Sequence, residues 1–221
     1  MKSSILVLLA VLASLSASAQ WDLGIDIKVY DPVGEFNTNV DGVAGGVSLR
    51  GIRNSANGRW AYGGEIGVAM YSNDQYDVTL PSGTQIEVGE EDCFWTFHGL
   101  VQYTLFQNEA IRTYGEGRVG MTTFFSSTIA LSETSEFNDE FEFHGTAFNT
   151  GLGGGVTLNI GKIFTGERNK FNLDAGVAVH SGSNAVYRDM DAVDTQASLA
   201  DANFRSLTHY VGYRFGLLIN L

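Results

Sequence analysis

The dominant pattern along the chain is an alternation of apolar residues with small or polar ones. In the first such segment, Leu23, Ile25, Ile27 and Val29 alternate with two aspartates, a glycine and a lysine. A period of two places each set on its own face of a β-strand. The pattern recurs along the chain and predicts eight strands and no convincing helix. The strands fall at 22–29, 42–49, 60–70, 95–105, 112–130, 142–161, 171–180 and 207–221.

The lengths of the connections separate two architectures that suit such strands. A soluble sandwich covers its apolar face with a second sheet, whereas a small membrane barrel turns that face to lipid. Three predicted connections are short (54–58, 107–111 and 162–169) and four are long (31–41, 72–92, 132–141 and 182–205), and the two kinds alternate strictly. Short periplasmic turns and long extracellular loops are typical of outer-membrane barrels. The sequence therefore predicts an all-β, eight-stranded antiparallel up-and-down transmembrane β-barrel with both termini in the periplasm.

Charge is sorted in the same way as connection length. The formal net charge is -12, which argues against a nucleic-acid partner because that needs a basic face. Basic residues gather at the short connections and acidic residues fill the long ones. The basic set is Arg53, Arg59, Arg112, Lys162, Arg168 and Lys170; the acidic set includes Asp74, Asp77, Glu87, Glu90, Glu91, Asp92, Glu133, Glu136, Asp139, Glu140, Asp189, Asp191, Asp194 and Asp201.

The two ends of the chain carry export and assembly patterns. Residues 1–19 read as a secretory signal peptide, with Lys2, an apolar stretch at 5–13 and an Ala-x-Ala site ending at Ala19. The predicted domains are therefore a cleaved signal peptide at 1–19 and a barrel domain at 20–221. The last strand ends in a polar, Gly, apolar, apolar pattern formed by Arg214, Gly216, Ile219 and Leu221. This pattern resembles the C-terminal signal by which outer-membrane barrels are inserted, with Leu221 where an aromatic residue is more usual.

Taken together, these features resemble the small eight-stranded outer-membrane barrels of the OmpA-transmembrane-domain and OmpX type, and in particular the outer-membrane β-barrel domain proteins of Bacteroidota. The resemblance covers essentially the whole mature chain and rests on architecture more than on diagnostic residues. It implies a location in the bacterial outer membrane and contact with its lipid and lipopolysaccharide. It also implies assembly by the barrel-assembly machinery and leaves room for an unidentified outer-membrane or extracellular protein partner.

Charged residues on the small-residue face of the strands are the main candidates for a site. An eight-stranded barrel has an interior that side chains fill, so these residues would meet inside it. We interpret them as a structural charge network that plugs the lumen, because unpaired buried charge is unfavourable. A narrow gated path for ions through the same residues is the alternative. The network comprises Asp26, Lys28, Glu65, Glu116, Arg118, Asp174 and Arg214, with His98 and His180 on the same face.

Enzymatic and metal chemistry find little support in the residue pattern. The stretch from His180 to Ala185 is similar to the His-x-Ser-Asn-Ala motif of lipid A deacylases, but Ser183 lies one residue too far and no Glu follows Glu167. The four histidines lack the spacing of metal ligands, and the acidic loops lack a Ca²⁺-loop motif. Because Cys93 is the single cysteine, an intrachain disulfide is excluded. We expect no cofactor and no catalytic residues. The predicted function is a structural or surface-interaction role, with a small-solute pore and a lipid A deacylase-like hydrolase as alternatives.

Overall fold

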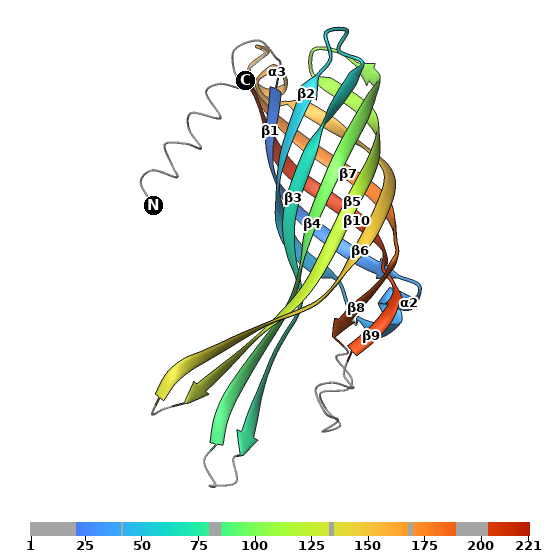
Figure 1. The fold of residues 1–221 in the computed structure, drawn as a ribbon. Coiled ribbons are helices and arrows are strands. Elements are labelled where there is room, and N and C mark those ends of the chain that lie inside the picture. The colour runs from blue at the N-terminus through green and yellow to red at the C-terminus, as the bar shows by residue number, and fades with distance from the viewer. Residues whose placement is uncertain (1–20, 41, 80–84, 133–134, 168–169, 189–202) are drawn as a thin grey trace, which may run out of the picture.

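The computed structural model describes residues 21–40, 42–79, 85–132, 135–167, 170–188 and 203–221. Eight of its strands close into one antiparallel barrel in the order β1-β10-β7-β6-β5-β4-β3-β2, which confirms the predicted fold (Figure 1). Strands that pair in the barrel also follow one another along the chain, if β8 and β9 of the separate small sheet are left out. The exception is the pair β1 and β10, which closes the barrel. The topology is therefore up-and-down. The barrel strands are β1 (Trp21–Val33), β2 (Ala44–Asn54), β3 (Trp60–Thr79), β4 (Gln85–Gln107), β5 (Ile111–Ser132), β6 (Ser135–Asn159), β7 (Phe171–Gly182) and β10 (His209–Asn220).

The barrel closes where the first and last strands pair. The register of β1 with β10 runs from Asp22 opposite Asn220 to Val33 opposite His209. Closure leaves the middle of the barrel without an unpaired edge, so every strand there has hydrogen-bonded neighbours on both sides. The predicted signal peptide, residues 1–19, lies outside the described residues.

The two mouths of the barrel differ strongly. The turn-side mouth holds the short β2–β3 and β4–β5 turns, the first residues of β1 and the C-terminal end of β10 (Figure 1). The hairpin-side mouth holds the long β3–β4 and β5–β6 hairpins, the helix α2 (Glu35–Asn39) and a small two-stranded sheet. That sheet pairs β8 (Asn184–Arg188) with β9 (Asn203–Leu207).

The prediction of long loops at 72–92 and 132–141 is wrong, because the strands continue through most of both segments. β3 pairs with β4 out to Thr79 opposite Gln85, and β5 pairs with β6 out to Ser132 opposite Ser135. Together these extensions form a four-stranded arm that stands away from the barrel (Figure 1). The alternation of apolar and polar residues fades in these segments, yet backbone pairing persists.

Two short helices also depart from the prediction of no helix. Each is five residues long: α2 lies within the 31–41 connection, and α3 (Ile160–Phe164) follows β6. In α3 the Asn159 side chain accepts a hydrogen bond of 2.9 Å from the Lys162 amide, which caps the helix N-terminus. None of the helices in the described part of the chain is long and apolar enough to cross a membrane.

The two faces of the barrel wall separate cleanly by chemistry. Large apolar side chains face outward and are exposed, as at Leu152 (77% exposed), Phe148 (72%) and Leu105 (68%). Charged and hydroxylated side chains face inward and are buried, as at Asp26, Arg50 and Thr96. The structure is therefore inverted relative to a soluble protein, with the polar core inside and the apolar surface outside.

Candidate functional site

The lumen of the barrel is filled by a network of paired charges. Four cations and four carboxylates line its central part, so their formal charges cancel. They are Lys28, Arg50, Arg118 and Arg214, with Asp26, Glu65, Glu116 and Asp174, and all are buried. The surplus negative charge of the chain therefore lies outside this network.

Asp174 is the acceptor at one end of the network. Its Oδ2 accepts hydrogen bonds from Nη2 of Arg50 at 2.9 Å and from Nε of Arg214 at 3.1 Å. Its Oδ1 accepts hydrogen bonds from the hydroxyls of Tyr114 at 3.0 Å and Thr157 at 2.9 Å. One carboxylate on β7 thus gathers donors from β2, β5, β6 and β10 and links opposite walls of the barrel.

Glu65 and Glu116 continue the network toward the hairpin-side mouth. Oε1 of Glu65 lies 2.7 Å from Nζ of Lys28, 3.1 Å from Arg118 and 3.8 Å from Nδ1 of His98. Glu116 pairs with Arg118 at 2.5 Å and with Arg214 at 3.1 Å. Since Arg118 and Arg214 each bridge two carboxylates, the pairs form one connected chain.

The burial of these groups sets what the network can do. Removing isolated charges from water costs several kcal/mol for each ion, and only close pairing and further hydrogen bonds offset it. Here Asp26 is held by Arg50 at 3.0 Å and also accepts from the Ser48 hydroxyl at 3.4 Å. Gln102 donates to Glu116 at 2.7 Å. Such a network links the strands across the lumen, and its charged groups bind one another.

A second polar layer lines the turn-side mouth. Asp22 accepts hydrogen bonds from Asn54, at 2.9 Å, and from Asn220, and Arg112 donates to Asn54 at 3.2 Å. On the other side of Asn220, two further asparagines continue the chain: Asn172 donates to it at 2.5 Å, and Asn159 donates to Asn172 at 2.9 Å. This layer borders a cavity of about 500 Å³ that is open at the mouth.

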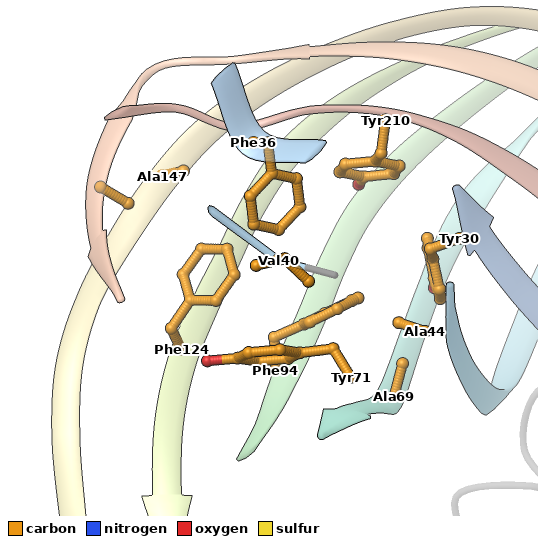
Figure 2. Packing of buried hydrophobic residues seen from close by; sticks show 11 residues of the cluster. Tyr30, Phe36, Val40, Ala44, Ala69, Tyr71, Phe94, Phe124, Ala147 and Tyr210 are labelled. Atoms are coloured by element: carbon orange, nitrogen blue, oxygen red, sulfur yellow. The ribbon is translucent and has the colours of Figure 1, made fainter. Parts of the chain in front are cut away.

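The hairpin-side mouth is closed by aromatic rings instead of charges. Tyr30, Tyr71, Phe94, Phe124 and Tyr210 converge from five strands, and Phe36 of α2 sits among them (Figure 2). The centroids of Tyr30 and Phe94 are 5.1 Å apart and those of Phe94 and Phe124 are 5.7 Å apart. Between this cluster and the charge network, His180 stacks on Tyr210 at 4.4 Å. The lumen is thus blocked at one mouth and filled in its centre.

The residues of the C-terminal pattern fall on different faces of β10. Arg214 belongs to the lumen network, and Gly216 lies opposite Asp26 in the register. Ile219 is partly exposed on the outer face, and the amide of Leu221 donates to the carbonyl of Trp21 at 2.9 Å. The pattern thus serves the closure of the barrel as well as the interior.

The two residues of the deacylase-like stretch point to different sides of the wall. His180 is buried inside the barrel at 1% exposure, between Tyr210 and His98. Ser183 is exposed, and its Oγ accepts the amide of Phe148 at 3.0 Å. No group of three or more His, Cys, Asp or Glu among the described residues is placed to hold a metal ion. Glu133, Asp189, Asp191, Asp194 and Asp201 of the acidic connections lie outside the described residues.

Two members of the network, Arg50 and Tyr114, are missing from the set predicted from the sequence. Arg50 pairs with Asp26 and Asp174, but the strand predicted at 42–49 ends one residue before it. Its place in the alternation, after the inward Ser48 and between outward Leu49 and Gly51, is the signal that could have identified it. Tyr114 is the second: its hydroxyl donates to Asp174 and accepts from Arg214 in the interior.

Comparison with known proteins identifies the fold. No protein-family model matches the sequence, and no curated protein matches it. Neisserial surface protein A aligns over 91% of this chain and 97% of its own, with a TM-score of 0.51 and 12% identity. A major outer membrane protein from Thermus thermophilus covers 91% and 99%, with a TM-score of 0.48 and 13% identity. Ail of Yersinia pestis, solved with the heparin analogue sucrose octasulfate, covers 92% and 97%, with a TM-score of 0.47 and 12% identity. The chain has the fold of small eight-stranded outer-membrane barrels.

Proposed function

We propose that this protein is an integral barrel of the bacterial outer membrane with a closed lumen, a structural or surface-interaction role and no enzymatic activity. The observation that carries the proposal is the exposed apolar outer wall. Water-soluble monomers rarely expose an apolar patch of more than a few hundred Å². Here exposed apolar side chains surround a closed barrel, including Ile25, Leu49, Val101, Val119, Phe148, Leu152, Val179 and Phe215.

The dimensions of this wall suit the hydrocarbon layer of an outer membrane. On β4, the outward residues run from Trp95 to Leu105, which is about 34 Å along a strand at about 3.4 Å per residue. A strand tilt of about 45° reduces that to about 24 Å, close to the apolar band of about 25 Å in such barrels. Arg53, an outward-facing charged residue of β2, lies at the turn-side mouth, outside this band.

The charge network supports a structural role. A lysine or arginine side chain turned to the bilayer centre costs about 2–4 kcal/mol in such barrels, and a carboxylate costs less. Shifting one strand by a single residue would turn its buried charges outward and its apolar residues inward. The network therefore favours one register and one orientation of each strand, in addition to bracing the walls.

The filled lumen argues against the pore alternative. Purified protein in planar bilayers is expected to show no stepwise conductance, because paired charges occupy the centre of the lumen and aromatic rings pack together at the hairpin-side mouth. An open eight-stranded or larger barrel protein serves as the positive control. Reproducible unitary conductance of correctly folded protein, verified by a gel shift between unboiled and boiled samples, would establish the pore instead.

The charge of the four-stranded arm supports a surface-interaction role. The sequence holds no Lys or Arg between Trp60 and Ile111 or between Val119 and Gly161, while acidic residues are frequent in the arm segments. An arm of one charge sign favours partners of the opposite sign and repels a second copy of itself. A cationic surface of an outer-membrane or extracellular protein, or lipopolysaccharide phosphates bridged by divalent cations, would fit this arm.

The proposed orientation places the arm outside the cell and both termini in the periplasm. An epitope tag inserted between Ser132 and Ser135 is expected to bind antibody on intact cells. A matched tag between Ala56 and Asn57, in the β2–β3 turn at the other mouth, is expected to bind only after the outer membrane is permeabilised. Labelling with the opposite pattern would reverse the orientation, and equal labelling of both tags on intact cells would contradict a membrane-spanning barrel.

The absence of enzymatic activity is also part of the proposal. A serine nucleophile needs a base within hydrogen-bond reach and an acid to orient that base. His180 instead lies inside the barrel against Tyr210, whereas Ser183 is exposed and binds backbone groups. This arrangement supports a barrel that does not hydrolyse lipid A.

A further inference from the structure

The aromatic cluster at the hairpin-side mouth combines side chains from the barrel strands with side chains from a connecting segment. The strand side chains, which we name the aromatic chamber, are the rings of Tyr30, Tyr71, Phe94, Phe124 and Tyr210 (Figure 2). All five belong to barrel strands, so the barrel fixes their positions. Phe36 and Val40, by contrast, come from α2 and its C-terminal cap, and both are 1–2% exposed. The ring of Phe36 meets that of Phe124 edge-on, with centroids 5.8 Å apart.

The segment that carries Phe36 is bounded by two glycines in left-handed backbone conformations. Gly34 has a φ of 65° and Gly42 a φ of 97°, which L side chains rarely adopt. A Cβ at either position would meet no atom within 4 Å, so local crowding does not explain the glycines. One hydrogen bond joins α2 to β9: the Leu207 amide donates to Oε2 of Glu35 at 3.4 Å. The two glycines are therefore the points about which the backbone would turn if this segment left the chamber.

A carboxylate lies at the outer rim of the chamber. Asp92 precedes Phe94 by two residues on β4, so it faces the same way about 7 Å farther toward the hairpins. It is buried, and it accepts a hydrogen bond from Ser126, which stands two residues beyond Phe124 on β5. Aromatic rings attract cations through their negative faces, and a nearby carboxylate adds direct charge attraction. The chamber and its rim therefore combine a site for a ring with a site for an ammonium group.

We propose that the aromatic chamber is a binding site for small aromatic ammonium compounds and that Phe36 is its built-in competitor. In the closed state the Phe36 ring takes the place of the ligand's ring. When α2 swings out about Gly34 and Gly42, the ligand's ring packs against Phe94 and Phe124 and its ammonium group approaches Asp92. Because binding requires the open state, the apparent affinity of the wild-type protein is lowered by the fraction of molecules that are open.

The test uses 2-phenylethylamine, which is a cation at neutral pH, and full-length mature protein folded in lipid nanodiscs. Isothermal titration calorimetry is run on the wild type and on Phe36→Ala, with empty nanodiscs subtracted. Removing the competitor is expected to tighten binding by about tenfold or more. Phe164→Ala is the matched control, because Phe164 is exposed at the opposite mouth, and it is expected to leave the affinity unchanged.

Charge selectivity tests the role of the rim. In Phe36→Ala, 3-phenylpropionate, which has the same ring and the opposite charge, is expected to bind about tenfold more weakly than 2-phenylethylamine. Asp92→Asn in the same background is expected to remove most of that difference. Equal affinity for the cation and the anion would overturn the assignment of an ammonium site.

A second measurement does not depend on a destabilising variant. Wild-type protein with 4-fluorophenylalanine at position 36 is titrated with 2-phenylethylamine and followed by ¹⁹F NMR. A saturable move of the signal from a buried to a solvent-exposed environment is expected. An unchanged ¹⁹F signal up to saturating probe, or Phe36→Ala binding no tighter than the wild type, would overturn the proposal.

Discussion

Asp174→Asn is expected to lower the free energy of unfolding by about 3–5 kcal/mol, the range seen when one partner of a buried ion pair is removed. Asp174 accepts from Arg50, Arg214, Tyr114 and Thr157 at 2.9–3.1 Å. The asparagine has nearly the same shape but presents an NH₂ group to neighbours that are themselves donors. It also leaves four buried cations against three carboxylates, so both the hydrogen bonds and the charge balance are lost.

Urea titrations of the refolded protein in lipid vesicles, followed by tryptophan fluorescence, measure this loss. Asp77→Asn is the control, because Asp77 is exposed on the arm and its charge is removed by the same change of atoms. Its unfolding midpoint is expected to stay near that of the wild type. Equal and small shifts for both variants would show that the lumen charges do not brace the barrel.

Gly216→Ala is expected to destabilise the barrel by about 1–3 kcal/mol, the usual range for overpacking a filled interior. A Cβ on Gly216 would overlap Oδ1 of Asp26 and would lie 2.6 Å from the carbonyl oxygen of Ile25. The backbone of β1 is fixed by its pairing with β10 and β2, so relief requires moving Asp26 away from Arg50. The added methyl group therefore disturbs both the closing seam and the charge network.

Gly117→Ala is the matched control, because a Cβ at Gly117 would meet no atom within 4 Å. Refolding both variants from urea into lipid, without any cellular assembly factor, separates packing from signal recognition. A Gly216→Ala protein that refolds with wild-type stability in lipid but fails to assemble in cells would contradict the packing explanation. That result would favour a role for Gly216 in the C-terminal assembly pattern.

The aromatic chamber and the charge network together explain how the lumen is closed. The network fills the centre, where Asp26, Asp174 and Glu116 hold the arginines across the barrel. The chamber closes the hairpin side with rings that α2 completes through Phe36. Removal of Phe36 would open the chamber without opening a path through the barrel, because the paired charges remain beneath it.

Local residue pattern determined the class of fold and the facing of the strands. An alternation with a period of two was enough, because the outer face of the barrel wall is apolar and the inner face is polar. Whether a residue has an odd or even place in its strand (its parity) therefore decides which face it lies on. The same parity placed Asp26, Lys28, Glu65, Glu116, Arg118, Asp174 and Arg214 on one side. Parity does not reveal which of these meet, since their contacts join strands up to 124 residues apart, as in Arg50 with Asp174.

Only the tertiary structure decided the ends of the strands and the closing of the hairpin-side mouth. The alternating pattern predicts that the strand from Trp60 ends at Met70, while hydrogen-bonded pairing continues to Thr79, because backbone pairing does not require alternation. Phe36 carries no periodic signal, because it lies in the predicted connection 31–41. Its position inside the barrel follows from the open ring of five aromatic side chains, which becomes a chamber only when distant strands close around it.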